Sequence, residues 1–210
     1  MKLFIRLFML LLLPFIATSQ MFKNADFIAP LDEGYAAVKS NNQWGFIDES
    51  GKLIMDFRTD LISNDQVTTE VDLGVASQLY PVMVEERAII KKQVNGIDYY
   101  GFINPTGKIV IEPRFLNVSN FKEGFALALA VSEDVLGENK ALGKRVVSYS
   151  YDVVLIDSEG TIVKYLCGPF KVSLSKDKLK KAPPIVVKDI SENLIAVKTP
   201  KGKWEVVGID

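Results

Sequence analysis

The chain has 210 residues, with no histidine and a single cysteine, Cys167. Without histidine it cannot form a Ser-His-Asp or Cys-His nucleophile pair, an HExxH zinc protease site or any imidazole metal site. One cysteine allows neither an intrachain disulfide nor a thiolate cluster. Cys167 lies between Leu166 and Gly168 in an apolar stretch, which predicts a buried, inert thiol; the alternative is a disulfide to another chain.

Two short segments approach catalytic motifs without completing them. Gly137 and Gly143 resemble a phosphate-binding loop, but five residues intervene instead of four, and Arg145 stands where Ser or Thr must hold magnesium. Ser173 and Lys176 fit the SxxK pattern, but its KTG and SDN companions are missing. Two of the 26 acidic side chains could still meet in space for glycoside hydrolysis. We therefore predict a protein that is not an enzyme and binds no cofactor or metal, with a polysaccharide hydrolase or lyase as the alternative.

The N-terminal segment has the pattern of an export signal. Lys2 and Arg6 precede an apolar run from Leu7 to Ile16, and small residues follow before Gln20. This run is shorter than the roughly 20 residues that span a bilayer, and no later stretch of 18 apolar residues exists. We expect a cleaved signal peptide over residues 1–19, no transmembrane segment after its removal, and a periplasmic or extracellular mature chain. An uncleaved N-terminal anchor is the alternative.

Charge is balanced overall but unevenly distributed. The chain has 25 Lys and Arg residues against 26 Asp and Glu residues, which predicts no nucleic-acid partner. Residues 20–163 carry 13 basic and 21 acidic side chains, net −8, whereas residues 164–210 carry 10 and 5, net +5. A short lysine-rich segment concentrates the positive charge; its lysines are Lys176, Lys178, Lys180 and Lys181. We interpret it as a solvated loop, with a patch for an acidic partner or anionic glycan as the alternative.

Four pairs of an Ile followed by Asp or Asn lie at a nearly regular spacing, which indicates internal repeats. The pairs begin at Ile47, Ile103, Ile156 and Ile209, at spacings of 56, 53 and 53 residues. After the first three pairs, a glycine follows the Asp or Asn by three residues. This pattern predicts a hairpin turn with a left-handed glycine, because a calcium loop requires alternate acidic positions. The turn residues are Asp48, Gly51, Asn104, Gly107, Asp157 and Gly160.

Short segments rich in Val, Ile and aromatic residues flank each turn. Their four to six residues predict strands, since helices need longer segments. A further strand follows Gly34, Gly124 and Asn193, and in the second copy we assign it to residues 79–85. The pattern predicts an all-β chain of tandem three-stranded antiparallel units with long insertions at about 59–78 and 130–146. The repeat domain covers residues 20–210, with units at roughly 22–58, 79–115, 121–170 and 187–210.

The first two copies share a distinctive order of residues. Copy one reads Glu33-Gly34-Tyr35-Ala36 and Gln43-Trp44-Gly45-Phe46-Ile47-Asp48; copy two reads Tyr100-Gly101-Phe102-Ile103-Asn104 and Glu112-Pro113-Arg114-Phe115. These segments resemble the WG repeat, a β-rich module that bacteria often export. Copy three departs, with Val153-Val154 at the aromatic-glycine pair, and copy four aligns Trp204 with Trp44 and Ile209-Asp210 with Ile47-Asp48. The resemblance implies export and tandem β-units, and it supplies no catalytic residues.

The aromatic-glycine pair has a packing interpretation. A large aromatic beside a glycine permits close approach, so we expect Trp44 and Tyr100 to stack between neighbouring units; sugar stacking on exposed aromatics is the alternative. One three-stranded unit cannot bury its apolar face alone, so the units must pack on one another. We expect an open array rather than a small propeller-like closure, because propeller blades usually have four strands. The sequence thus favours an exported binding module whose partner is a protein or a cell-envelope glycan.

Overall fold

The computed structural model describes residues 22–64, 67, 73–140, 143–173 and 176–209. The predicted signal peptide, residues 1–19, lies outside this part of the chain. Strands dominate the described residues, and the helices found there are two short 3-10 turns, η2 (Val75–Ser77) and η3 (Lys176–Lys180). The all-β prediction is confirmed.

The strands form four antiparallel sheets that follow one another along the chain. The first sheet contains β1 (Phe27–Ile28), β2 (Tyr35–Ser40), β3 (Gln43–Asp48) and β4 (Leu53–Arg58). The second contains β5 (Ala88–Val94), β6 (Ile97–Ile103) and β7 (Ile109–Phe115). The third contains β8 (Phe125–Asn139), β9 (Lys144–Asp157) and β10 (Ile162–Ser173). The fourth contains β11 (Val187–Ser191), β12 (Leu194–Lys198) and β13 (Trp204–Gly208).

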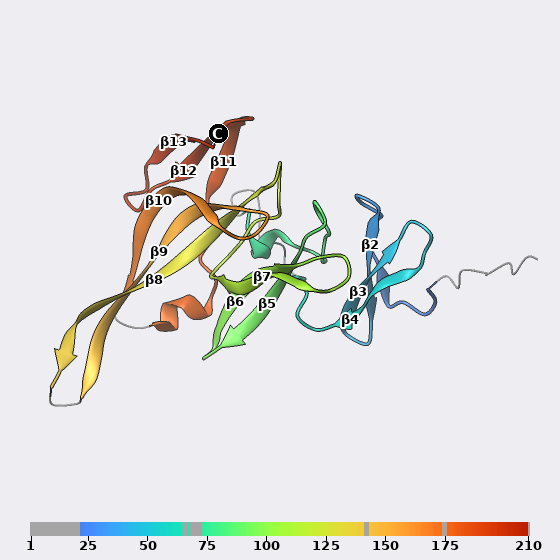
Figure 1. The fold of residues 1–210 in the computed structure, drawn as a ribbon, viewed down its shortest axis with the longest axis horizontal. Coiled ribbons are helices and arrows are strands. Elements are labelled where there is room, and N and C mark those ends of the chain that lie inside the picture. The colour runs from blue at the N-terminus through green and yellow to red at the C-terminus, as the bar shows by residue number, and fades with distance from the viewer. Residues whose placement is uncertain (1–21, 65–66, 68–72, 141–142, 174–175, 210) are drawn as a thin grey trace, which may run out of the picture.

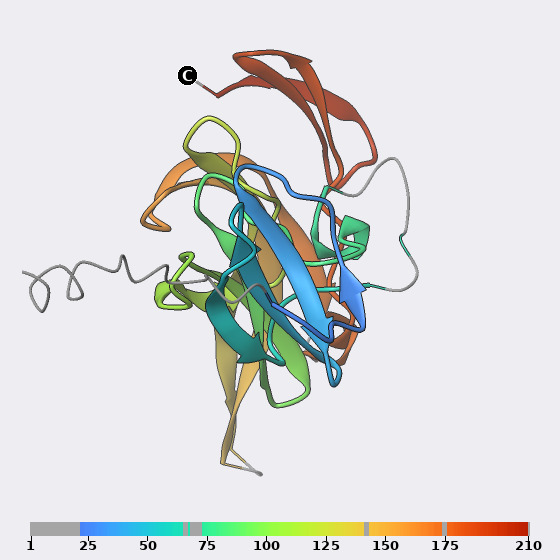
Figure 2. The ribbon, with the colours of Figure 1, turned by 90° about the vertical axis from the view of Figure 1, so that its right-hand side faces the viewer.

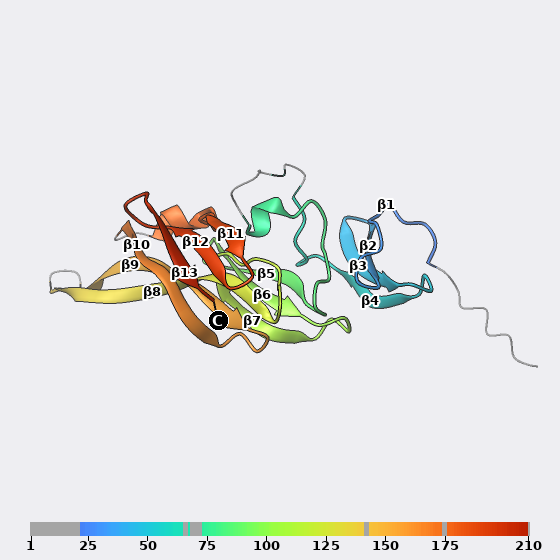
Figure 3. The same ribbon diagram turned by 90° about the horizontal axis from the view of Figure 1, so that it is seen from above.

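The first three sheets lie in an open row, from the blue strands at one end to the yellow and orange strands at the other (Figures 1 and 3). The fourth sheet packs beside the third. Figure 2 looks along the row, with the first sheet in front of the others. The described strands of the first and last sheets do not pair with each other, so the row does not close. Tandem antiparallel units in an open array are confirmed, and the propeller-like alternative is not adopted.

A five-residue turn joins the last two strands of each of the first three sheets. In the first sheet, Asp48 Oδ1 accepts hydrogen bonds from the backbone N–H groups of Ser50 and Lys52, at 2.9 and 3.1 Å. Gly51 closes the turn with φ of 76°, which a residue with a Cβ adopts only with strain. Asn104 and Asp157 accept the same pair of bonds in the second and third sheets.

A two-residue turn with positive φ precedes the first long strand of these three units. Glu33 and Gly34 form it in the first unit, where Asp32 bridges to Tyr35. Corresponding turns are formed by Glu85 with Glu86 and by Glu123 with Gly124. Glu86 takes the glycine position with φ of 59°, so the second unit lacks the glycine that marks the others.

Our assignment of a strand to residues 79–85 in the second unit is therefore wrong. Its true counterpart is β5, which begins at Ala88, after the Glu85 turn. The predicted insertion at 130–146 also differs, because β8 and β9 continue through it as one paired hairpin out to Asn139 and Lys144. Our alignment of Ile209 with Ile47 is also displaced, by two residues. Ala36, the second residue of β2, pairs with Ile47, and Ile195, the second residue of β12, pairs with Val207, so Val207 is the true counterpart of Ile47.

Gly45 and Gly101 lie where the neighbouring strand of the same sheet bulges over them. A Cβ on Gly101 would lie 2.6 Å from the Pro113 nitrogen and 2.7 Å from the Glu112 carbonyl carbon. A Cβ on Gly45 would lie 2.8 Å from the Met55 carbonyl oxygen. The pairing register shifts beside both glycines, as expected for a bulge. The close approach of the neighbouring strand within the same sheet thus requires a glycine at this position of the repeat.

Three hydrophobic clusters lie mainly between successive sheets. Trp44 is 7% exposed in the cluster between the first and second sheets, and its Nε1 donates to Ser63 Oγ at 3.1 Å. Tyr100 is 6% exposed in the cluster that joins the second and third sheets. Both aromatics thus lie at junctions between units. Trp204 of the fourth sheet is 41% exposed, with Lys188 Nζ 4.7 Å from its ring centre.

Candidate functional site

Glutamates at the two-residue turns connect successive units through main-chain hydrogen bonds. Glu33 Oε2 accepts from the N–H of Glu85 in the next turn at 2.7 Å. The Glu85 carboxylate in turn accepts from the N–H groups of Glu123 and Gly124, at 2.5 and 2.9 Å. We call Glu33, Glu85 and Glu123 the turn carboxylates. Each of the first two binds the backbone of the turn that follows.

Arginines make a second set of connections between units. Arg58 at the end of β4 donates from Nη1 to the carbonyl oxygen of Gly107, at 2.8 Å. Arg114 in β7 donates from Nη2 to the carbonyl oxygen of Gly160, at 2.6 Å. Asp60 accepts two bonds from Arg58, which raise the pKa of the guanidinium. Each arginine therefore binds the glycine turn of the next unit.

Neither connection continues at the junction between the third and fourth sheets. Counting from the start of each strand, Cys167 in β10 takes the position of Arg58 and Arg114. Its Sγ lies 3.9 Å from the carbonyl oxygen of Lys198. Among the described contacts, the Glu123 carboxylate accepts no hydrogen bond from the fourth sheet. The third junction therefore lacks both polar connections of the first two.

Cys167 is half-buried rather than fully buried as we expected. Burial raises the pKa of its thiol, and the negative charge of Glu205 raises it further. The thiol is therefore predominantly protonated at neutral pH, which fits an unreactive side chain.

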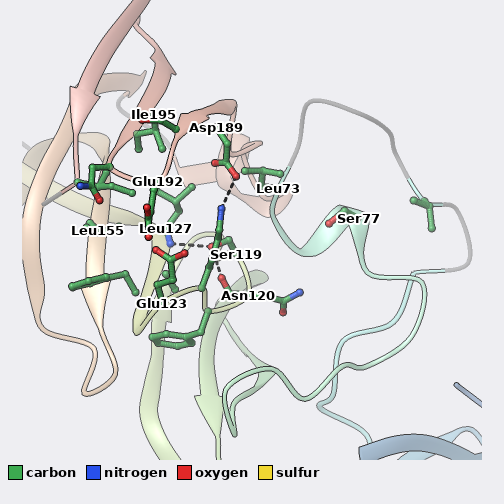
Figure 4. Close-up of a pocket in the computed structure, with 18 residues that line it drawn as sticks. Leu73, Ser77, Ser119, Asn120, Glu123, Leu127, Leu155, Asp189, Glu192 and Ile195 are labelled. Atoms are coloured by element: carbon green, nitrogen blue, oxygen red, sulfur yellow. Dashed lines mark hydrogen bonds and ion pairs between the residues drawn. The ribbon is translucent and has the colours of Figure 1, made fainter. Parts of the chain in front are cut away.

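A cavity of about 670 Å³ lies at this third junction (Figure 4). The third sheet and the loop before it contribute one wall, β11, β12 and the turn between them contribute another, and the segment around Leu73 and Ser77 completes the lining. We call it the junction groove. Buried apolar side chains line part of it, including Leu127, Leu155 and Ile195. A cavity of this size is within the range of about 300–1,000 Å³ that small-molecule sites occupy.

The junction groove carries an excess of negative charge. Its described lining includes the carboxylates of Glu123, Asp189 and Glu192 and the ammonium of Lys122. Lys122 Nζ lies 3.0 Å from Asp189 Oδ2, an ion pair that links the third and fourth sheets and raises the pKa of Lys122 (Figure 4). After that pair is counted, Glu123 and Glu192 remain as exposed carboxylates. The groove therefore favours a cationic or hydrogen-bond-donating ligand.

Two further polar groups line the groove. Ser119 Oγ accepts from the N–H of Leu127 at 2.9 Å and donates to the carbonyl oxygen of Asn120 at 2.8 Å. Both hydrogen bonds of this hydroxyl are therefore made to backbone groups. Asn120 Oδ1 is buried and has no hydrogen-bond partner among the described residues.

The lysine-rich segment is separate from the groove and mainly forms η3, which packs against β6 and β10. Lys178 Nζ lies 3.5 Å from the carbonyl oxygen of Val172, and Lys180 Nζ lies 2.7 Å from Asp177 Oδ1. Lys181 is exposed, and the side chain of Lys176 lies outside the described part of the chain. The local conformation differs from the predicted loop, since Lys176, Lys178 and Lys180 belong to a 3-10 turn, but Lys178, Lys180 and Lys181 are exposed to solvent.

Most of the repeat residues singled out from the sequence lie in turns, in bulges or at junctions, and none of the groove residues was among them. Gly34 and Gly124 lie in two-residue turns, and Pro113 lies in the bulge of β7. A signal for the groove was nonetheless present, because Glu33, Glu123 and Glu192 precede Gly or Asn at corresponding points of three copies.

The fold and the groove define an open array of β-repeat units with a cavity at one junction. The family model of the WG containing repeat matches residues 26–44 and 100–129. These two segments thus match the WG repeat, and the resemblance seen in the first two copies of the sequence is confirmed. No match to the chain was found among curated proteins or among solved structures.

Two further features are absent from the described residues. None of the helices found there is both long and apolar enough to pass through a membrane. His, Cys, Asp and Glu side chains do not gather there in a group of three suited to hold a metal ion.

Proposed function

We propose that this protein is an exported, non-enzymatic binding module that holds a partner protein or a cell-envelope glycan in the junction groove. The observation that carries the proposal is the interruption of the inter-unit connections at the junction where the 670 Å³ cavity lies. The first two junctions direct their turn carboxylates and arginines to the next unit. The third leaves Glu123 available to another molecule, beside an apolar surface. Export rests on the pattern of the first 19 residues.

Capture from a cell-envelope fraction, with the groove open and blocked, tests the proposal. Ser191 is exposed in the groove lining, so Ser191→Trp places a large side chain there without disturbing the core. Ser132→Trp makes the same change on an exposed position of the long hairpin and serves as the control. We expect wild type and Ser132→Trp to retain the same partner and Ser191→Trp to lose it. Equal capture by all three proteins would refute a role for the groove.

A glycan hydrolase or lyase is the second candidate function, favoured by the three carboxylates that line one cavity. A screen of cell-wall and polysaccharide substrates separates the two functions. Turnover that disappears in both Glu123→Gln and Glu192→Gln would replace the binding proposal with an enzymatic one. We expect no turnover.

The lysine-rich segment offers a separate test of the acidic-partner alternative. Changing Lys176, Lys178, Lys180 and Lys181 to Gln leaves the groove intact. We expect the captured partner to bind with unchanged affinity and unchanged salt dependence. Weaker binding with a shallower salt dependence would instead assign a partner-facing role to this segment.

A further inference from the structure

We propose that the junction groove recognises the tip of a β-hairpin, using Glu123 to bind two adjacent main-chain N–H groups at a turn that carries a basic residue. This inference rests on the proposed binding function and names the chemistry of its ligand. It comes from what the equivalent carboxylates do elsewhere in the same chain. The occupant we infer is a partner protein with an exposed basic hairpin.

The recognition geometry is present at the preceding junction. Glu85 accepts from the N–H groups of Glu123 and Gly124, the two central residues of a turn with φ of 55° and 80°. Both values are positive, as in the tight turns that join hairpin strands. The two strand-forming neighbours, Lys122 and Phe125, pair with each other, so the central N–H groups remain free for a carboxylate. A turn carboxylate thus selects a specific backbone shape.

Glu123 occupies the same position in its own turn as Glu85, but no described backbone N–H group of the fourth sheet donates to its carboxylate. The pairing of β11 with β12 shifts register between Asp189 and Ser191, beside the Glu192 turn. The Glu123 carboxylate instead lines the groove (Figure 4). Charge-assisted hydrogen bonds to a carboxylate are among the stronger ones, so this unused acceptor favours a ligand with paired donors.

The remaining groove surface specifies the residues around the turn. Glu123 and Glu192 leave a net negative charge once Lys122 is paired with Asp189, so a Lys or Arg on the ligand is favoured. Leu127 and Ile195 offer an apolar surface for a neighbouring aliphatic side chain.

Synthetic hairpins test this inference on the full mature chain. The probe is a backbone-cyclised β-hairpin peptide with an Asn-Gly turn flanked by Lys and Leu, and its matched partner is N-methylated at both turn nitrogens. Calorimetric titration compares wild type, Glu123→Gln and the control Glu138→Gln, an exposed glutamate near the tip of β8. Glu123→Gln keeps the backbone N–H that binds Glu85, so folding is preserved, and thermal unfolding verifies this.

We expect the hairpin to bind wild type and Glu138→Gln equally, and to bind Glu123→Gln at least about tenfold more weakly. The N-methylated hairpin should show a similar loss, because its charge remains but its donors are removed. Failure of the hairpin to bind wild type, or equal binding of both hairpins, would overturn the inference. A dimer of the free protein that Glu123→Gln dissociates would assign the groove to a second copy and also overturn it. If hairpin binding fails while capture of a partner remains sensitive to Ser191→Trp, the proposed function stands without this inference.

Discussion

Replacing Gly101 with alanine should destabilise the protein more than the same change at a glycine with open space. The added Cβ would meet the backbone of β7, at 2.6 Å from the Pro113 nitrogen and 2.7 Å from the Glu112 carbonyl carbon. Backbone cannot rotate away as a side-chain tip can, so the bulge of β7 must move. Overpacking of this kind costs about 1–3 kcal/mol. The Cβ would also meet the Ile111 carbonyl oxygen, and these three backbone contacts place Gly101→Ala at the upper end, about 3 kcal/mol.

Scanning calorimetry measures this effect as a lower Tm. In a chain of this size, about 3 kcal/mol corresponds to a decrease of roughly 6–12 °C, at about 2–4 °C per kcal/mol. Gly124→Ala is the matched control, because its φ of 80° costs backbone strain but its Cβ would meet nothing within 4 Å. We expect it to cost about 1 kcal/mol. A Tm for Gly101→Ala at or above that of Gly124→Ala would refute the steric explanation of the aromatic-glycine pair.

Three further outcomes are expected. Burial, with a smaller effect of the Asp98 charge, raises the pKa of Tyr100 to about 12 from 10.0. The stability that this shift contributes is therefore complete below pH 10 and is lost as the pH rises towards 12; Tyr100→Phe should remove this loss in alkaline urea titrations. Arg114→Met should lower the free energy of unfolding by about 1 kcal/mol in urea denaturation, because the Gly160 carbonyl loses its donor. N-terminal sequencing of the native protein should begin near Gln20, and a product that begins at Met1 would contradict export with cleavage.

Local sequence patterns predicted the units because the turns are determined locally. Asp48 and Gly51 act within five residues, through a side chain that binds nearby N–H groups and a glycine that accepts positive φ. The same logic failed where a residue adopts an unfavourable conformation under tertiary constraint. Glu86 has φ of 59° without being glycine, so the turn before β5 gave no recognisable signal.

The groove was beyond sequence reasoning because it depends on contacts between units. Glu33 and Glu85 are ordinary surface glutamates in the sequence, and only the fold shows that each binds the next turn. Likewise, the sequence around Cys167 predicts a core thiol, and only the fold shows that Cys167 occupies the strand position of Arg58 and Arg114. The absence of these hydrogen bonds at the third junction can be recognised only by comparison with the first two junctions, where they are formed.

Amide hydrogen exchange on the complex with the captured partner tests most directly whether the third junction is the binding site. The interrupted connections predict that binding slows exchange at residues 119–127 and 189–195, which line the groove, and leaves the long hairpin at 132–140 unchanged. Protection confined to the lysine-rich segment or to the long hairpin, with no change at the groove, would contradict the assignment.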